Sequence, residues 1–322
     1  MSKDGLVQGR KMTKAFVFPG QGSQAVGMGK ELAEAFSSAR EVFEEVDEAL
    51  KQKLSKLMFE GPGEDLTLTE NAQPAIMAVS LACARVLQKE GKVDLSTDAQ
   101  FVAGHSLGEY SALAAAGTFA LADAARLLKI RGQSMQAAVP VGEGAMAAIL
   151  GLTLEDAQAV AEEAAQGEVC AAANDNALGQ VVLSGSKSAV ERVIKIASGK
   201  GAKRCVLLPV SAPFHCALMA PAAEVMAQAL ADVKMSAPVV PVVANVTASA
   251  QDNVDEIRRL LVEQVTGMVR WRESVLYMKY KGVDTLVELG AGKVLTGLAR
   301  RIDREISGVA VGTPKGIEAF LA

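Results

Sequence analysis

The chain has 322 residues, half of them apolar, with 33 Lys plus Arg against 37 Asp plus Glu and a formal net charge of −4. That length allows two domains or one large domain with an insert, and the apolar content excludes intrinsic disorder. The acidic balance argues against a dedicated nucleic-acid-binding protein, which is normally basic. No apolar run reaches the ~18 residues needed to span a bilayer, so neither a nucleic acid nor a membrane is expected as a partner.

The cysteines and the N-terminus favour a cytoplasmic protein. The four cysteines are scattered along the chain: Cys83, Cys170, Cys205 and Cys216. They form no Cys-x-x-Cys pair, which excludes a dense disulfide framework and the common zinc spacings, and no metal site is predicted. Residues 1–11 are polar and lack the apolar segment of a secretory signal; we interpret them as an N-terminal extension that precedes a plausible restart at Met12.

Short apolar runs alternate with longer helical stretches along most of the chain. The runs predicted as strands include residues 15–18, 101–103, 206–210, 239–244 and 285–288. This alternation favours an α/β fold with a largely parallel sheet.

Residues 143–208 follow a different order. The predicted elements are a strand at 145–150, a helix at 154–165, strands at 169–173 and 180–184 joined by a loop at 174–179, a helix at 188–198 and a strand at 204–208. The order βαββαβ is that of the split ferredoxin-like unit. We therefore predict a core formed by residues 12–142 and 209–312, with a ferredoxin-like small subdomain, 143–208, inserted into it. The crevice between two such parts is a usual place for a substrate.

A nucleophile candidate lies in Gly104-His105-Ser106-Leu107-Gly108, which matches G-x-S-x-G between an apolar run and a predicted helix at 109–116. This is the strand–turn–helix context that the motif requires. The glycines allow strained dihedrals, and the new helix directs its N-terminal amides at the reaction centre. The amide of Leu107 is then placed to hold an oxyanion.

The base has two candidates, because the chain contains only His105 and His215. His105 adjoins the serine, and adjacent residues around a turn seldom aim their side chains at each other. His215 follows the predicted strand at 206–210, in a turn-rich stretch of the kind where catalytic side chains gather. Ser106–His215 is the preferred pair, with a surface-loop role for His215 as the alternative. No aspartate stands out as a third member, and a backbone carbonyl can also orient an imidazole.

A glycine turn, Pro19-Gly20-Gln21-Gly22, follows the first predicted strand. A nucleotide-binding loop fails on spacing, since G-x-G-x-x-G is absent and Gly29-Lys30 lacks the flanking residues of a P-loop. Two interpretations remain: an ordinary turn, or an active-site turn whose Gln21 side chain points at the substrate.

Six motifs in order carry a family resemblance. They are Phe18-Pro19-Gly20-Gln21-Gly22-Ser23-Gln24, Gly104-His105-Ser106-Leu107-Gly108-Glu109-Tyr110, Arg131-Gly132, Pro213-Phe214-His215-Cys216, Gln264 before Val269-Arg270-Trp271, and Gly290-Ala291-Gly292-Lys293-Val294-Leu295. Over about residues 13–312 the chain resembles the malonyl-CoA:acyl-carrier-protein transacylases of bacterial fatty acid synthesis. These are relatives of the acyltransferase domains of polyketide and animal fatty acid synthases.

The resemblance implies an α/β-hydrolase-like core with a ferredoxin-like insert, and it assigns roles residue by residue. Ser106 would be the acylated nucleophile and His215 its general base, which Gln264 orients through its backbone carbonyl. Gln21 and the amide of Leu107 would form the oxyanion hole.

The resemblance also assigns substrate contacts. Arg131 would hold the malonyl carboxylate, while Asn174 and Gln180 match a family segment that lines the cleft. Phe214 stands where bacterial members often carry Ser, and it is similar to the malonyl-selective pattern of the polyketide relatives. Ala291 replaces a common Pro at a structural position.

The implied reaction is ping-pong transfer of malonyl from malonyl-CoA, a substrate, to the phosphopantetheine thiol of holo acyl carrier protein, with no cofactor. A monomer is expected. Because the carrier is acidic, the cleft mouth should be locally basic. The candidate clusters are Arg258, Arg259, Arg270 and Arg272, and Lys200, Lys203 and Arg204. The alternatives are a polyketide-pathway acyltransferase, a serine thioesterase or hydrolase of the same fold, and a non-catalytic carrier-binding subunit.

Overall fold

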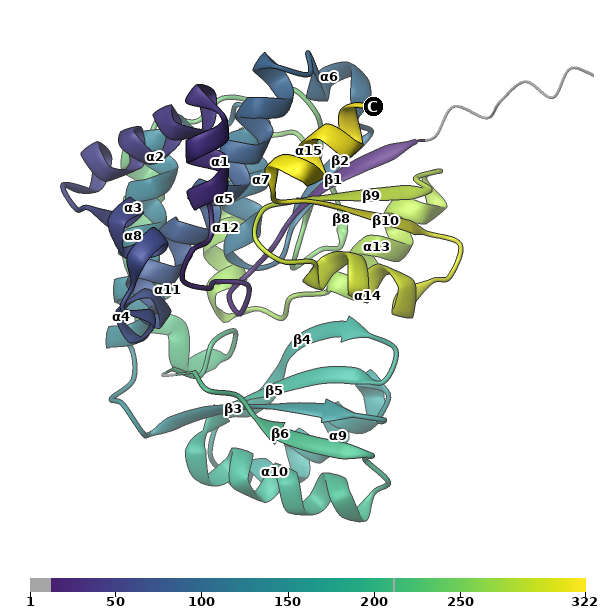
Figure 1. Cartoon of the computed structure of the whole chain (residues 1–322). Coiled ribbons are helices and arrows are strands. Elements are labelled where there is room, and N and C mark those ends of the chain that lie inside the picture. Colours follow the sequence, from purple (N-terminus) through teal and green to yellow (C-terminus); the bar gives the residue numbers. More distant parts are fainter. Residues whose placement is uncertain (1–12, 211) are drawn as a thin grey trace, which may run out of the picture.

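The computed structural model describes residues 13–210 and 212–322, so the extension predicted at 1–11 lies outside the described residues. The larger part is built on a six-stranded sheet of order β10-β9-β1-β2-β7-β8 (Figure 1). Its strands are β1 (Lys14–Phe18), β2 (Phe101–Gly104), β7 (Val242–Ala244), β8 (Ser249–Gln251), β9 (Thr285–Leu289) and β10 (Ser307–Val311). Neighbouring strands are parallel except for β8, which pairs antiparallel with β7. The predicted α/β class is confirmed.

Helices cover both faces of this sheet because its strands are apolar on both sides. In β1, Phe16 and Phe18 point into one core and Ala15 and Val17 into the other. On the first face, α5 (Thr69–Lys89), α7 (Leu107–Ala115) and α15 (Pro314–Leu321) contact the strands. The same core is shared by further helices: α1 (Lys30–Ala35), α2 (Ser37–Leu50), α3 (Leu54–Glu60), α4 (Gly63–Thr67), α8 (Leu121–Ala137), α11 (Ala220–Asp232) and α12 (Val254–Thr266). The second face packs against α13 (Trp271–Tyr280) and α14 (Val294–Ile302). Two short elements, α6 (Leu95–Asp98) and the 3₁₀ turn η1 (Ala217–Met219), complete this part.

A separate four-stranded antiparallel sheet, of order β4-β5-β3-β6, lies beside the large one (Figure 1). Its elements are β3 (Gly144–Leu150), α9 (Leu154–Ala165), β4 (Cys170–Ala177), β5 (Gln180–Ser186), α10 (Lys187–Gly199) and β6 (Arg204–Leu207). The two helices pack on one face of the sheet over a small apolar core of its own. The other face is turned toward the large sheet's domain.

The loop predicted at 174–179 is wrong, because β4 continues to Ala177 and leaves a short turn before β5. Register shifts between Ala172 and Asn174, and again between Asp175 and Ala177, bend the strand without ending its pairing. Pairing with β5 therefore holds in a strand polar residues that suggest a loop. A sequence pattern cannot reveal this pairing.

The small sheet is tied to the large domain through the segment between α12 and α13. The Asp175 amide donates to the Val269 carbonyl (3.0 Å), and the Val269 amide donates to the Ala173 carbonyl (2.8 Å). Arg272 Nε donates to Asp175 Oδ2 at 2.8 Å, and the Asp175 carboxylate is 1% exposed. The strand β4 is thus held by the chain that follows α12, at Val269 and at Arg272.

Three further observations concern the cysteines, metal ligands and helix length. In the described residues, all four cysteines are free thiols, and no group of His, Cys, Asp and Glu side chains is arranged to hold a metal ion. Across residues 13–210 and 212–322, none of the helices has the length and apolar character to cross a membrane.

Candidate active site

Ser106 lies in the sharp turn between β2 and α7, with φ 54° and ψ −111°, a strained conformation for a residue with a side chain. Two glycines make this turn possible. A Cβ on Gly104 would lie 1.8 Å from the Gly108 carbonyl oxygen, and a Cβ on Gly108 would lie 2.2 Å from that of Phe18. Only glycine fits either position, so the strand and helix can approach closely enough to expose the Ser106 hydroxyl.

Asn245, directly after β7, holds the turn from the neighbouring strand. Its Oδ1 accepts a hydrogen bond from the Ser106 amide (2.8 Å), and its Nδ2 donates to the Gly104 carbonyl (2.7 Å). The residue is fully buried. Sequence analysis did not identify Asn245, although a single polar residue after a buried apolar strand was a signal that could have found it.

His215 is the partner of the Ser106 hydroxyl, with 2.8 Å between Ser106 Oγ and His215 Nε2. On the other side of the ring, Nδ1 lies 2.9 Å from the Gln264 carbonyl oxygen and 3.1 Å from that of Gly267. Carbonyl oxygens only accept, so Nδ1 carries the proton and Nε2 is free to accept one. His215 has φ 58°, and this left-handed turn directs its ring back toward the elbow.

The electrostatic surroundings keep His215 neutral. Burial, and then the positive charge of Arg131, lower the pKa of His215 from 6.5 to about 3. The carbonyls that orient the ring lie at and just after the C-terminal end of α12, where helix carbonyls lack partners within the helix. That negative helix end favours the imidazolium that forms when His215 takes a proton.

Arg131, on α8, lies beside the same hydroxyl and is 1% exposed. Its Nη2 donates to Ser106 Oγ (3.1 Å) and to Gln264 Oε1 (2.9 Å), while Nη1 donates to Gln73 Oε1 (2.8 Å). Within the described residues its Nε has no hydrogen-bond partner. The guanidinium is held by neutral oxygens, so the site can accept an anionic group next to Ser106. Gln73 was not identified from sequence, because it is one of several polar residues near the start of α5 and nothing in the pattern distinguishes it.

His105 has a different environment from His215. Its Nε2 lies 2.8 Å from Asn176 Oδ1, and its ring lies against Trp271 with 5.8 Å between ring centroids. Burial lowers the pKa of His105. The ring therefore contacts the small subdomain through Asn176, while the Ser106 hydroxyl contacts His215.

A cavity of about 290 Å³ opens above Ser106, between the two parts of the molecule. From the large domain it is lined by Gln21, Gly22, Gln24, Thr67, Gln73, His105, Ser106, Leu107, Arg131, Met135, Phe214 and His215. From the small sheet and the strand-to-loop segment that follows it come Met146, Asn174, Leu208, Pro209 and Val210. A polar floor with the reacting groups thus faces a mostly apolar roof.

Two donors for an oxyanion also reach this cavity. Leu107 is the first residue of α7, so its amide is one of those without an intrahelical acceptor. Gln21 lines the cavity, and its Nε2 lies 3.5 Å from Thr69 Oγ1, a long contact that leaves the amide available for a ligand.

A family model described as the acyl transferase domain matches residues 15–312. The chain belongs to the acyl transferase family. The malonyl CoA-acyl carrier protein transacylase of Escherichia coli K12 is 48% identical over 307 residues, covering 95% of this chain and 98% of that protein. The crystal structure of an acyl-carrier-protein S-malonyltransferase from Bartonella henselae matches with a TM-score of 0.94 and 58% identity, covering 96% of this chain and 98% of that one.

A third acyl transferase relative was solved with a partner. A malonyl-transacylase in complex with a type II polyketide acyl-carrier protein matches with a TM-score of 0.93 and 43% identity, over 96% of this chain and 99% of that one. That malonyl-transacylase, which shares this fold, thus binds an acyl-carrier protein in its solved structure.

The structure does not bring Gln180 to the acyl transferase cavity. Gln180 begins β5 at the end of a hairpin, paired with Ala177, and its Oε1 accepts a hydrogen bond from Arg301 Nη1 (2.8 Å). It is not among the described residues that line the cavity. The extension of β4 explains the difference, because it carries the turn past Asn174, which does reach the cavity.

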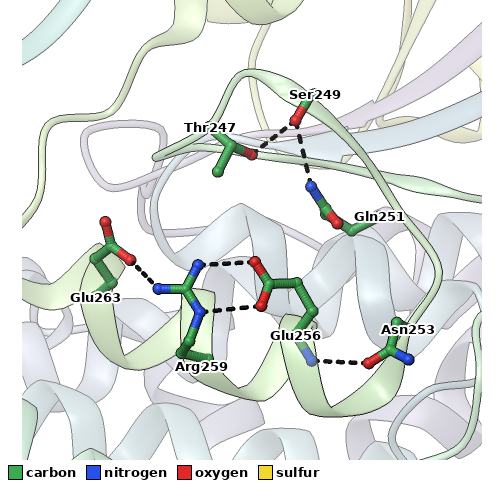
Figure 2. A network of polar contacts seen from close by, with 7 residues as sticks. All are labelled: Thr247, Ser249, Gln251, Asn253, Glu256, Arg259 and Glu263. Carbon is green, nitrogen blue, oxygen red and sulfur yellow. Dashed lines mark hydrogen bonds and ion pairs between the residues drawn. The ribbon is translucent and has the colours of Figure 1, made fainter.

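Three of the four arginines in the first expected basic cluster pair with acidic side chains, whereas Arg258 donates to the Leu230 carbonyl. Figure 2 shows the Arg259 guanidinium between two glutamates of α12: Nη2 and Nε donate to Glu256 (2.7 and 2.9 Å), and Nη1 donates to Glu263 (2.7 Å). Arg270 pairs with Glu273, and Arg272 with Asp175, as described above.

In the second cluster, Lys200 pairs with Glu163 (2.6 Å). Among the described residues, Lys203 and Arg204 have no ion pair. None of these basic residues lines the cavity at Ser106, so the expected basic cleft mouth stays a prediction.

Proposed function

We propose that this protein transfers a malonyl group from malonyl-CoA to the phosphopantetheine thiol of acyl carrier protein, through a malonyl ester of Ser106, in fatty acid biosynthesis. One observation carries the proposal. The Ser106 hydroxyl is hydrogen-bonded both by a neutral imidazole and by a buried guanidinium. A nucleophile with an anion-binding group beside it suits an acyl donor that ends in a carboxylate. The names of the relatives support the same substrate.

In the first half-reaction, His215 Nε2 takes the Ser106 proton as Oγ attacks the thioester carbonyl. The resulting oxyanion is stabilised by the Leu107 amide and the Gln21 side chain, each typically worth ~3 kcal/mol. As the tetrahedral intermediate collapses, the carbon–sulfur bond breaks. The leaving CoA sulfur takes the proton from the imidazolium, and malonyl remains as an ester on Ser106.

In the second half-reaction, the carrier thiol enters the same cavity. His215 deprotonates it, sulfur attacks the ester carbonyl, and the proton returns to Ser106 as its ester bond breaks. Because the acyl-enzyme must survive between the two steps, water has to be kept from it, and the apolar roof of Met146, Leu208 and Val210 serves that purpose.

Arg131 is the proposed specificity residue. A guanidinium can hold a carboxylate through two parallel hydrogen bonds, and its neutral neighbours Gln73 and Gln264 keep it in place between turnovers. An acetyl group would leave the buried cation without an anionic partner, which lowers the rate of its transfer. Phe214 and Asn174 line the remaining wall and limit the shape of the acyl group.

The finer fold assignment belongs to the same proposal. We interpret residues 12–142 and 209–312 as an α/β-hydrolase-like core and residues 143–208 as a ferredoxin-like subdomain. The βαββαβ order and the strand order β4-β5-β3-β6 support the second assignment. The free thiols suit a reducing cytoplasm, where we expect a monomer that needs no cofactor.

The test is intact-protein mass spectrometry after mixing with malonyl-CoA or acetyl-CoA. We expect a persistent malonyl adduct that is absent in Ser106→Ala and is not matched by acetyl-CoA. Ser111→Ala is the matched control, because Ser111 is a buried serine on α7, close in sequence to Ser106, and its hydroxyl has no partner among the described residues. Free malonate without an adduct would instead indicate a hydrolase. Neither an adduct nor malonate release would leave a carrier-binding protein without catalysis.

A polyketide pathway is the second candidate, favoured by the similarity to the complex with a polyketide carrier. Fatty acid synthesis and polyketide synthesis would use the same transfer chemistry and differ in the carrier protein that receives the malonyl group. Transfer rates to a fatty-acid carrier and a polyketide carrier, measured side by side with the same malonyl-enzyme, decide between them.

A further inference from the structure

Glu109 is a buried acid that the mechanism above does not use. It lies in the first turn of α7, three residues after Ser106, and is 1% exposed. Its Oε2 accepts hydrogen bonds from Gln264 Nε2 (2.8 Å) and from the Asn245 amide (3.1 Å). A buried carboxylate is costly unless it is well hydrogen-bonded, so its presence directly beneath the elbow calls for a physical reason.

Gln264 connects Glu109 to the reacting groups. Its Nε2 donates to Glu109 and to the Ser106 carbonyl (3.0 Å), whereas its Oε1 accepts from Arg131. A carboxylate only accepts, and a guanidinium only donates. The Gln264 amide therefore has one orientation that satisfies both, and turning it over would place donor against donor and acceptor against acceptor.

The same residue orients the base through its main chain. The Gln264 carbonyl accepts the His215 Nδ1 proton, and anchoring the Gln264 side chain at Glu109 fixes the last turn of α12 that carries this carbonyl. Glu109 thus acts at a distance on the imidazole and on the guanidinium, the two groups that contact Ser106 Oγ.

Charge supports the geometry. Arg131 is a buried cation held by neutral oxygens, and Glu109 is the acid whose charge favours its charged form. Burial raises the pKa of Glu109 to about 7, against the opposing effects of Gln264, the Asn245 amide and Arg131. The other titratable group that interacts with it is the Tyr110 phenol, whose pKa is raised mainly by burial.

We propose that Glu109, as a carboxylate, is a positioning residue for acyl transfer: through Gln264 it sets the orientation of Arg131 and of the carbonyl that aligns His215. The inference rests on the proposed function for the identity of the substrate. The contacts of Glu109 align Ser106 and His215 whatever acyl group is bound to Ser106.

The test compares Glu109→Gln with a matched buried glutamate. Glutamine keeps the shape and one acceptor oxygen and removes the charge. The control is Glu288→Gln: Glu288, on β9, is fully buried and accepts hydrogen bonds from the Leu295 and Thr296 amides (3.0 and 2.8 Å) at the start of α14, away from Ser106. Both variants lose one buried charge, so a general loss of stability affects both.

The measurements are kcat and KM for malonyl-CoA from pH 5.5 to 9, with the melting temperature of each variant. We expect Glu109→Gln to lower kcat/KM by about tenfold or more, as the loss of one charge-assisted hydrogen bond predicts. We expect the kcat/KM of the wild type to fall as the pH is lowered through the raised pKa of Glu109, because the carboxylate is then lost, and this fall should be absent in Glu109→Gln. Glu288→Gln should lower the melting temperature and leave kcat/KM and its pH profile unchanged.

Two results would overturn the proposal: Glu109→Gln with wild-type kcat/KM and pH profile, or the same small loss in both variants. A second readout separates this inference from the transfer function. The rate at which phenylmethylsulfonyl fluoride labels Ser106 reports on His215 and the elbow without malonyl-CoA. If wild type forms no malonyl adduct, the transfer function fails, yet slower labelling of Glu109→Gln alone still supports the positioning role. Equal labelling of all three proteins then contradicts it.

Discussion

The two walls of the cavity are built on different principles. The large domain contributes the groups that react, and each is held by buried hydrogen bonds from several elements: α5, α7, α8, β7 and α12. The small subdomain contributes mostly apolar surface, with Met146 on β3 and Asn174 on β4. Its polar contacts with the large domain include those to Val269, Arg272, His105 and Arg301. Stabilising the charges of a transition state requires dipoles and charged groups held in fixed positions, whereas excluding water requires only a close-fitting apolar surface.

The largest effect should come from the base. We expect His215→Asn to lower malonyl transfer by more than about 10³-fold, because the Ser106 proton then has no acceptor. The matched variant is His105→Asn, which changes the other histidine, at the boundary with the subdomain, and should lose far less. Steady-state kinetics with purified carrier protein measures both, and a reversed order would assign the base to His105.

Arg131→Lys tests the anion site within the large domain. We expect kcat/KM for malonyl-CoA to fall by about 100-fold, since a lysine cannot make the paired hydrogen bonds of a guanidinium, with little change for acetyl-CoA. Arg126→Lys is the control on the same helix, because Arg126 is exposed and pairs with Asp123. Equal losses for both acyl donors would mean that Arg131 supports the fold and does not select the substrate.

The buried imidazole predicts a pH dependence of stability. Since the pKa of His215 is lowered from 6.5 to about 3, the unfolded chain binds more protons below pH 6.5, and the contribution of His215 to stability falls as the pH falls through that window. Between pH 7.5 and 5 this amounts to about 2 kcal/mol. Glu109 acts in the opposite direction between pH 4.5 and 7, because its pKa is raised.

The His215 contribution is isolated by the difference between wild type and His215→Asn in urea unfolding at each pH, since Glu109 is present in both. Wild type should lose stability relative to the variant as the pH is lowered. A constant difference would mean that His215 is charged in the native protein.

The attachment of the subdomain can be weakened on its own. Arg272→Gln leaves the Asp175 carboxylate buried without its ion-pair partner, at a cost of about 1–2 kcal/mol for this partly exposed pair. We expect a larger share of malonyl-enzyme to be lost to water, measured as malonate released per transfer. Arg270→Gln, two residues earlier and paired with Glu273, is the control. An unchanged share of hydrolysis would show that the apolar roof does not depend on this tie.

The smallest effect is expected on the outer face of α12. Arg259→Gln breaks the two exposed ion pairs of Figure 2 and should leave the free energy of unfolding nearly unchanged, with transfer unaffected. Chemical denaturation and the transfer assay check this. A marked loss of transfer would indicate that this face contacts the carrier after all.

Much of this arrangement is readable in the sequence. The G-x-S-x-G pattern predicts the elbow because its glycines report backbone conformations that few other residues adopt. The shortage of histidines narrows the base to His215. The order of elements in residues 143–208 predicts the second sheet from short-range periodicity alone. The loop predicted at 174–179 is wrong because pairing with β5 extends β4 through polar residues to Ala177.

The sequence by itself predicted the elbow at Ser106, the preferred base His215 and the two kinds of sheet, because local patterns and the presence of only two histidines point to them. Only the tertiary structure decided which buried side chains support them. Gln73, Glu109 and Asn245 have no role assigned from the sequence, and the side-chain contacts of Gln264, which the resemblance named for its backbone carbonyl, appear only in the fold. They acquire a role when the parallel strands β2 and β7 and the helices α5, α7 and α12 converge at one edge of the sheet, where every buried polar atom must find a partner.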